Sequence, residues 1–418
     1  MFANRTIISL FILCWMAVVV PVFAAGTLSP YSRYGYGEWC SAAFSASKSM
    51  GGLGYGLRNN TSINMLNPAS YTAVDSLTFM LDLGVSGKID GFKTKSDNST
   101  LFNGNVDYVA IQLPLAKFAA ISFGVSPLTT VGYNYSFTDV KNPYTDKDTL
   151  TVKQSFNGNG GMTQVYLGLS FDILDRVAVG VNGHYVFGNI SHFRQVSFPY
   201  ESSMYKSTTQ TENLYVSAWL CDVGVQYHQP IGNSELVVGA AYSLQLPMHN
   251  RTVTTTQTTL IEEVVDTESA FDYPQIIGAG VSYKWENRLL VGVDVAWQNF
   301  AAANYYGKTQ QLNDRFVYAI GAQYVHKPGS KSYVENMEFR IGANYANSYI
   351  DIDNKGFDKW AITWGIGFPL PNTMTKLNLH MEYGQQGSIQ TNGLLERYYE
   401  IGIGVSLNER WFVKRKLK

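Results

Sequence analysis

About fourteen segments of the chain alternate apolar and polar residues, and this pattern constrains the fold more than any other feature. Such alternation predicts strands with one apolar face, and roughly ten residues in a tilted strand cross a bilayer. The segments lie near residues 77–85, 106–113, 118–126, 163–172, 177–187, 214–227, 235–246, 275–285, 289–299, 315–325, 338–349, 359–369, 376–384 and 396–407. An even number of such strands predicts an all-β membrane protein, a closed antiparallel transmembrane β-barrel of about fourteen strands.

The alternation is clearest in the second half of the chain. In the segment 289–299, one face holds Leu289, Val291, Val293, Val295 and Trp297, and the other holds Gly292, Asp294, Ala296 and Gln298. Aromatic residues lie near the segment ends, where a membrane barrel carries its interfacial belts. We therefore expect the apolar row to face lipid and the small and polar row to face the lumen.

The links between the segments alternate in length. Short links are 114–117, 174–176, 228–234, 286–288 and 370–375, and long links are 127–162, 188–213 and 247–274. This alternation is typical of outer-membrane barrels, in which periplasmic turns are short and extracellular loops are long. With an even number of strands, it predicts that both chain ends lie in the periplasm. Residues 252–259 and 261–266 predict a hairpin beyond the membrane, whereas the link 326–335 is long for a periplasmic turn. Within the link 127–162, the alternation of Val131, Tyr133, Tyr135 and Phe137 suggests another strand of this kind.

The composition supports a membrane barrel over a soluble protein. Charged residues are 15% and aromatic residues 14% of the chain, against about 25% charged residues in soluble domains. A secreted soluble β-protein, built as two sandwiches or a propeller, is the alternative, but no repeated blade signature is present. The formal net charge of −1 gives no reason to expect a nucleic-acid partner.

The first 24 residues predict a cleaved signal peptide. Arg5 gives a positive start, 7–20 is an apolar stretch too short for a transmembrane helix, and Val22-Phe23-Ala24 is a small-x-small cleavage site. No later segment holds about 18 uninterrupted apolar residues, so we expect no helical span. The predicted location is the outer membrane of a Gram-negative bacterium.

The mature N-terminus predicts a plug rather than a strand. Residues 47–74 are rich in Gly and Asn and show neither strand alternation nor a long helical stripe. We therefore divide the chain into the signal peptide 1–24, a plug inside the barrel at 25–75, the barrel at 76–409 and a basic periplasmic tail at 410–418. Gly51, Gly52 and Gly54 superficially resemble a phosphate-binding loop, but the strand and helix that such a loop needs are missing. Here the glycines would let the backbone fold tightly in a narrow space.

Charged residues suggest how a plug would dock. The candidate plug-wall charges are Arg33, Arg58, Asp294, Glu382 and Glu400. Lys48 adds to the positive charge of the plug. A cationic plug against an acidic wall is one reading, and hydration of the lumen by the same charges is the other.

The sequence predicts neither an enzyme, nor a metal site, nor a cofactor. None of the six histidines forms a metal-spaced pair, and no nucleophile elbow is present. His380 and Glu382 share a strand face, where lumen hydration is the commoner role. For Cys40 and Cys221, two unpaired residues are favoured over a disulfide.

A Gly-rich segment that closes on Leu-Asn-Pro-Ala, followed by about fourteen strands, resembles the long-chain fatty-acid transporter (FadL-type) outer-membrane family. The likeness rests on Ser49-Met50-Gly51-Gly52, on 64–66 and on the motif Asn67, Pro68 and Ala69. The Tyr-rich start and the ending Arg410 to Lys416 resemble the branch found in Bacteroidetes-type bacteria.

The resemblance implies a hatch that fills the barrel, an apolar ligand path and lateral exit at a kinked third strand. On this chain the lateral gap would lie near Gly124 and Pro127. The plug side chains that would line the path are Tyr31, Tyr34, Tyr36, Trp39, Phe44 and Tyr55. Plug packing is the alternative role for each of these aromatic residues.

The resemblance implies two alternative functions. The first is an outer-membrane channel for passive uptake of hydrophobic small molecules such as long-chain fatty acids. The alternative is a non-transporting barrel that acts as an accessory subunit of a larger outer-membrane secretion or assembly complex. The expected partners are the lipid bilayer and lipopolysaccharide, a hydrophobic ligand, and other outer-membrane or periplasmic proteins. A continuous apolar path would favour uptake, and a sealed lumen would favour the accessory subunit.

Overall fold

The structure is a computed structural model of the chain, and it describes residues 28–141, 150–198, 206–330, 332–352, 355–371 and 374–410. The predicted signal peptide lies outside the described residues. So does the predicted basic tail, apart from Arg410.

Fourteen antiparallel strands form a closed barrel, as the alternation predicts. These are β2 (Thr78–Lys93), β3 (Asn98–Ala116), β4 (Ala119–Lys141), β5 (Leu150–Leu174), β6 (Val177–Ser197), β7 (Thr208–Ile231), β8 (Ser234–Ser243), β12 (Gln275–Trp285), β13 (Leu289–Asn299), β14 (Arg315–Val325), β15 (Glu338–Ala346), β18 (Lys359–Pro369), β19 (Lys376–Ser388) and β20 (Leu394–Arg410). Each pairs with the next in this order, and β20 pairs with β2 from Arg410 opposite Thr78 to Leu395 opposite Lys93, which closes the ring. The predicted fold class is confirmed.

The remaining elements are short or lie beyond the ring. They are η1 (Pro30–Arg33), β1 (Glu38–Trp39), α2 (Ser45–Lys48), η2 (Pro68–Ala73), β9 (Leu246–Thr258), β10 (Glu262–Thr267), β11 (Phe271–Tyr273), η3 (Val334–Asn336), β16 (Asp351–Ile352), β17 (Lys355–Gly356) and α3 (Ile389–Asn392). Within the described ranges, every helix is too short or too polar to cross a membrane.

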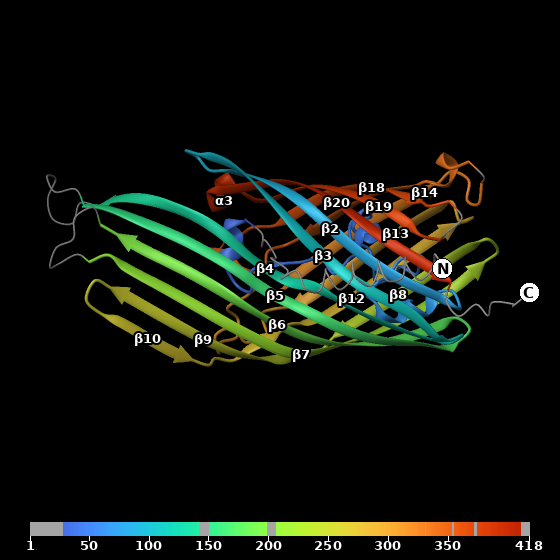
Figure 1. Cartoon of the computed structure of the whole chain (residues 1–418), viewed down its shortest axis with the longest axis horizontal. Coiled ribbons are helices and arrows are strands. Elements are labelled where there is room, and N and C mark those ends of the chain that lie inside the picture. The colour runs from blue at the N-terminus through green and yellow to red at the C-terminus, as the bar shows by residue number, and fades with distance from the viewer. Residues whose placement is uncertain are drawn as a thin grey trace, which may run out of the picture.

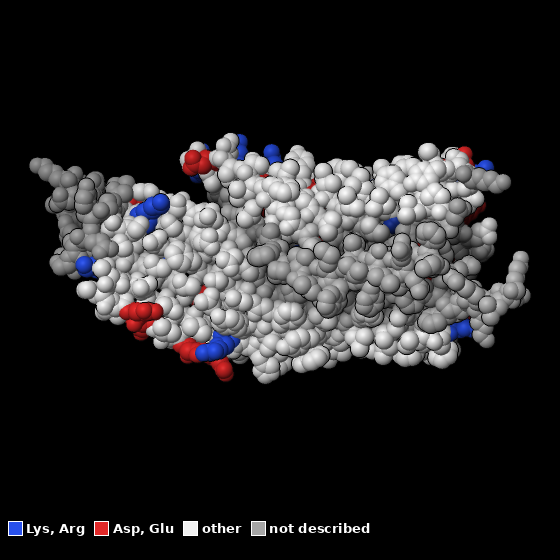
Figure 2. Space-filling view, viewed as in Figure 1, with Lys and Arg blue, Asp and Glu red and all other residues white. Residues whose placement is uncertain are grey.

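The two strand faces meet different surroundings. On β13, the side chain of Val293 is 49% exposed on the outside, whereas that of Asp294 is 5% exposed and faces the lumen. On the face in Figure 2, among the atoms that are not grey, charged residues lie mainly toward the two ends and leave a mostly uncharged band between them. At one edge of this band Trp285, Leu289, Tyr324 and Phe339 lie in register on four neighbouring strands. The band is the lipid-facing surface of the barrel.

A cation in the middle of this band should destabilise the barrel. We expect Val293→Arg to lower the free energy of unfolding by about 2 kcal/mol, because Val293 lies midway along β13 and an arginine at the bilayer midplane is costly. The same substitution at Leu289, at the strand end, should cost less. Urea titration in lipid vesicles measures both variants, and equal losses at the two positions would contradict this placement of the bilayer.

The barrel rim is uneven. Strands β4 to β7 have 23, 25, 21 and 24 residues, whereas β12, β13, β14 and β18 have 11 each. The long strands run past the band at the end opposite both barrel termini, which is the extracellular end (Figure 1). The prediction that 127–162 and 188–213 are loops was therefore wrong over most of their length. The predicted hairpin is present as β9 and β10, and β9 pairs with β7.

Within the described residues the ring has one seam, between β3 and β4. Their ladder runs from Ala116 opposite Ala119 to Val109 opposite Val125 and ends there. Above that point β3 pairs with β2 and with no other strand that the structure describes, and β4 continues on β5 to Lys141. The two strands therefore separate on the extracellular side (Figure 1).

The N-terminal segment, residues 28–75, lies inside the ring of strands. Its hydrogen bonds reach lumen-facing residues or backbone carbonyls of β3, β6, β7, β8, β12, β13, β18 and β20. Its apolar side chains join three buried clusters with the wall, the largest at the extracellular half of the barrel. The core of the protein is thus the interface between this segment and the lumen wall.

Candidate functional site: the lumen and the N-terminal segment

One wall carboxylate receives three consecutive backbone amides of the N-terminal segment. Oδ2 of Asp294 accepts hydrogen bonds from Gly54 N at 2.6 Å and Tyr55 N at 2.8 Å, and Oδ1 accepts from Gly56 N at 3.4 Å. The backbone carbonyl of Gly56 in turn accepts from Ser282 Oγ of β12 at 2.7 Å. Charged acceptors form the stronger class of hydrogen bond, so this loop is firmly attached to β12 and β13.

The motif Asn67, Pro68 and Ala69 joins a helix start to the wall. Asn67 Oδ1 accepts from Ala69 N at 3.1 Å and so caps η2, whose first residue is Pro68. Asn67 Nδ2 donates to the backbone carbonyls of Tyr55 at 2.8 Å, Val225 at 3.2 Å and Ala240 at 3.3 Å. One amide side chain therefore connects two parts of the segment to β7 and β8.

The segment and the wall approach each other through glycine. Gly51 has φ +72°, and a Cβ there would meet Ala343 O at 2.5 Å. Its N–H donates to Thr363 Oγ1 at 2.8 Å. On the wall side, a Cβ on Gly342 would lie 2.3 Å from Gly51 N. Only glycine permits this contact between two backbones.

A methyl group at this contact should push the segment away from the wall. We expect Gly342→Ala to lower the free energy of unfolding by about 2 kcal/mol, the range for overpacked sites. Gly183→Ala is the matched control, because the nearest atom to a Cβ there is Leu167 O at 4.0 Å. Urea unfolding in vesicles measures both, and a neutral Gly342→Ala would show that the segment is not seated as described.

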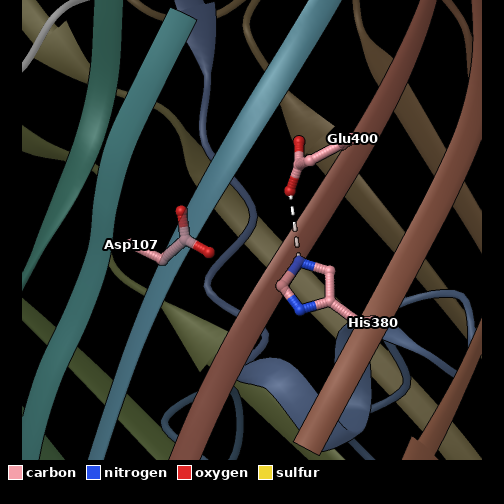
Figure 3. Close-up of side chains that lie close together, drawn as sticks. All are labelled: Asp107, His380 and Glu400. Carbon is pink, nitrogen blue, oxygen red and sulfur yellow. Dashed lines mark hydrogen bonds and ion pairs between the residues drawn. The ribbon is translucent and has the colours of Figure 1, made fainter.

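Three wall residues, Asp107, His380 and Glu400, lie close together in the lumen (Figure 3), and a lysine of the segment reaches two of them. Lys48 Nζ lies 2.9 Å from Asp107 Oδ2 and 3.3 Å from Glu400 Oε1. His380 Nε2 lies 3.4 Å from Glu400 Oε1. On β3, Tyr108 pairs with Gly84 of β2 and Val106 pairs with Val85, so Asp107 between them is an extra residue. This bulge directs the Asp107 carboxylate to the site. Burial would lower the pKa of Lys48, but Asp107 and Glu400 outweigh it and raise the pKa above its usual value.

Asp107, His380 and Glu400 also form a donor set that a metal ion would accept, with ligand atoms within 4.8 Å of one another. The Lys48 ammonium bonds to two of the three groups. The chain therefore supplies its own cation at this position, and the cluster works as an ion-pair lock.

The two predicted arginines do not pair with the predicted carboxylates. Arg33 donates to Tyr135 OH at 2.8 Å and its guanidinium lies 4.0 Å from the centre of the Phe156 ring. Arg58 pairs with Asp172 at 3.4 Å, near the periplasmic end of β5. Among the other predicted charges, Asp294 and Glu400 bind the segment as described, and Glu382 accepts from Tyr398 OH at 2.6 Å. The cations of the segment that meet wall carboxylates are therefore Arg58, at Asp172, and Lys48, at Asp107 and Glu400.

The aromatic residues predicted to line a ligand path are packed against other side chains. Tyr31 stacks on Phe357 with ring centres 4.4 Å apart, and Phe44 stacks on Tyr108 at 3.8 Å. Trp39 lies 5.3 Å from the Phe300 ring. Tyr34 and Tyr36 belong to the same extracellular cluster as Tyr31, and Tyr55 lies against Gly278 of β12.

The N-terminal segment covers the lower part of the seam. Gly124 lies one residue before the end of the β3–β4 ladder, and Pro127 comes directly before a bulge of β4. Just above, β1 pairs with β4, with Glu38 opposite Thr130 and Trp39 opposite Thr129. Cys40 N donates to Leu128 O at 3.0 Å. Cys40 and Cys221 are both free thiols.

Two cavities border the segment. A small one of about 50 Å³ lies at the extracellular side, bordered by Tyr31, Trp39 and Lys359. A wide one of about 1160 Å³ opens at the periplasmic mouth, where Arg58, His228, Glu235, Lys284 and Lys376 are among its lining residues. The larger space is thus polar and lies below the segment.

Solved structures of outer-membrane channels share this fold. A Pseudomonas aeruginosa FadL homologue is 11% identical, with 93% of this chain and 100% of that chain covered and a TM-score of 0.62. The Ralstonia pickettii toluene transporter TbuX is 13% identical, covers 89% and 99%, and has a TM-score of 0.58. The Pseudomonas putida toluene transporter TodX is 13% identical, covers 89% and 100%, and has a TM-score of 0.59. These likenesses establish a FadL-like barrel.

Sequence comparison gives the family. No curated protein matches the chain. A family model described as BamG matches residues 4–418, nearly the whole sequence. This chain is therefore a member of the BamG family.

Proposed function

We propose that the protein is a non-transporting barrel subunit of a larger outer-membrane assembly complex, in which the N-terminal segment closes the lumen. The observation that carries this proposal is the attachment of the segment to opposite sides of the wall. Asp294 holds its middle, Asn67 joins it to β7 and β8, and Lys48 ties it to β3 and β20. Membership of the BamG family favours a role in an assembly complex.

The packing of the segment favours a fixed closure over a moving gate. Moving it would expose the carboxylates of Asp107 and Glu400 and break the hydrogen bonds of Asp294 and Asn67 together. The aromatic residues that a ligand would have to pass are in contact with each other and with the wall. A barrel closed in this way provides surfaces for partners instead of a path.

Native mass spectrometry of the chain, tagged at its chromosomal locus and extracted in mild detergent, tests the proposal. We expect the chain to appear with other subunits in fixed stoichiometry and without a bound apolar molecule. A lone chain that carries fatty-acid or hydrocarbon masses would overturn the proposal.

Passive uptake of hydrophobic small molecules is the second candidate, and the seam favours it. The β3–β4 ladder ends beside Gly124 and Pro127, and the large aromatic cluster lies directly behind it. An apolar molecule that left sideways there would enter the bilayer without meeting water. The FadL homologue, TbuX and TodX have the same fold.

Uptake of a radiolabelled fatty acid or of toluene by intact cells separates the two candidates. If the chain transports, deleting it lowers the rate. If the chain is an assembly subunit, deletion does not alter the rate once the abundance of other outer-membrane proteins is taken into account.

A further inference from the structure

The extracellular part of β4 has a free edge. Strands β4 to β7, β9 and β10 extend beyond the membrane band as one sheet, with β4 and β10 as its two edge strands. Above Thr130, no strand in the described ranges pairs with β4 on the side that faces away from β5. An unpaired edge presents backbone donors and acceptors to any passing chain.

Along a strand, the backbone N–H and C=O groups of successive residues point alternately to the two neighbouring strands, which identifies the groups of β4 that point away from β5. Gly132 N donates to Ser32 Oγ at 3.0 Å, and Gly132 O accepts from the same hydroxyl at 3.1 Å, so the backbone of Gly132 faces the edge. Every second residue of a strand faces the same way. The next edge-facing residues are Asn134, Ser136 and Thr138, and all three are exposed.

The two edges of this sheet are protected to different degrees. The edge strand β10 has six residues, of which Glu262, Glu263 and Asp266 carry charge. Charged residues and shortness are the usual means of preventing unwanted pairing. The β4 stretch from Leu128 to Thr138 has no charged residue and no proline. A long uncharged edge of this kind is normally covered.

The lower part of the same edge already holds an extended segment. There β1 pairs antiparallel with Thr129 and Thr130. Above it, Tyr135 and Phe137 stack on Phe156 with ring centres 5.3 and 5.8 Å apart. Phe137 remains 48% exposed. A second strand that continued above β1 would find backbone groups at the edge and an aromatic surface beside them.

We propose that an extended strand of a partner subunit pairs with β4 at Asn134, Ser136 and Thr138. The partner segment is uncharged, and its alternate apolar side chains cover Phe137. Main-chain hydrogen bonds give the contact its affinity and the alternate side chains give its specificity. This inference rests on the proposed function, because it names the surface by which the subunit binds its complex.

Site-specific photo-crosslinking tests the pairing directly. p-Benzoylphenylalanine is placed singly at positions 134, 136 and 138 of the tagged chain in its own outer membrane, and the crosslinked peptides are mapped. We expect all three adducts within one segment of one partner, at residues that step by two, because a ladder fixes register. Val264 on the β10 edge is the control position. Adducts scattered over several segments, adducts no more abundant than at Val264, or adducts with a second copy of this chain would overturn the inference.

Proline substitution gives an independent measurement. Because Ser136 N–H faces the edge, Ser136→Pro leaves its pairing opposite Ser155 of β5 intact and removes only the outward donor. We expect recovery of the partner with the tagged chain to fall about tenfold, the equivalent of one net hydrogen bond. Ser136→Ala keeps the donor and should recover the partner normally. Equal recovery with Ser136→Pro and Ser136→Ala would contradict the pairing.

The wild-type chain separates failure of this inference from failure of the proposed function. If the wild-type chain recovers no other subunit, the proposed function fails. If it recovers subunits but the crosslinks do not step by two along one partner segment, only this inference fails.

Discussion

Asp294→Ala should free the middle of the N-terminal segment. The substitution leaves the amides of Gly54, Tyr55 and Gly56 without their acceptor inside the lumen. An unsatisfied buried donor costs about 1–3 kcal/mol, so we expect the segment to be held about 4 kcal/mol less tightly. Trypsin reports the change, because the Arg58 side chain is 8% exposed in the wild type and should become a cleavage site in the variant.

The control for this prediction is Asp266→Ala. Asp266 forms an ion pair with Arg251, but both residues are exposed on the extracellular hairpin. We expect this variant to resist trypsin at Arg58 as the wild type does. If Asp294→Ala is equally resistant, the carboxylate does not hold the segment.

Lys48→Met should have an effect of similar size at the other side of the lumen. Methionine keeps the length of the side chain but leaves Asp107 and Glu400 facing each other without the ammonium. Removing one partner from a buried ion pair costs about 3–5 kcal/mol. We expect a loss of about 3 kcal/mol in the free energy of unfolding, since Lys48 and Glu400 keep some exposure. Urea titration in vesicles measures it.

A second substitution tests whether the loss comes from the unpaired carboxylates. Adding Glu400→Gln to Lys48→Met removes one uncompensated charge, so the double variant should be more stable than Lys48→Met alone. Lys93→Met, at the exposed end of β2, is the control and should be neutral. A double variant that is less stable than Lys48→Met would contradict the ion-pair lock.

The membrane part of the fold could be predicted because the bilayer imposes a strong contrast on each strand. Residues 289–299 and 359–369 are predicted as strands and are β13 and β18 with the same bounds. The contrast weakens above the membrane, because the outer face of β4 and β5 meets water instead of lipid while Val131, Tyr133 and Phe156 are buried on the inner face, and there 127–162 looks like a loop. The length of strands β4 to β7 was therefore missed.

The site was less predictable, because an irregular segment has no periodicity that fixes which residue meets which strand. Asp294 could be recognised as a lumen carboxylate from its strand face, but its partners are backbone amides, which any sequence supplies. Asp107 turns to Lys48 through a bulge that no local pattern indicates. Assignment to the Bacteroidetes-type branch stays a prediction.

A disulfide across β1 and β4 tests most directly whether the segment stays in place while the protein functions. Trp39 and Thr129 are opposite each other. Because Cys40 N bonds to Leu128 O, the pair 39 and 129 is the closely spaced kind that a disulfide fits. The variant carries cysteines at both positions and alanine at Cys40 and Cys221, and its reduced form is the control. We expect the oxidised and reduced forms to recover the same subunits from the outer membrane in the same amounts. Loss of the subunits on oxidation, or an oxidation-dependent fall in hydrocarbon uptake by the cells, would contradict a fixed closure.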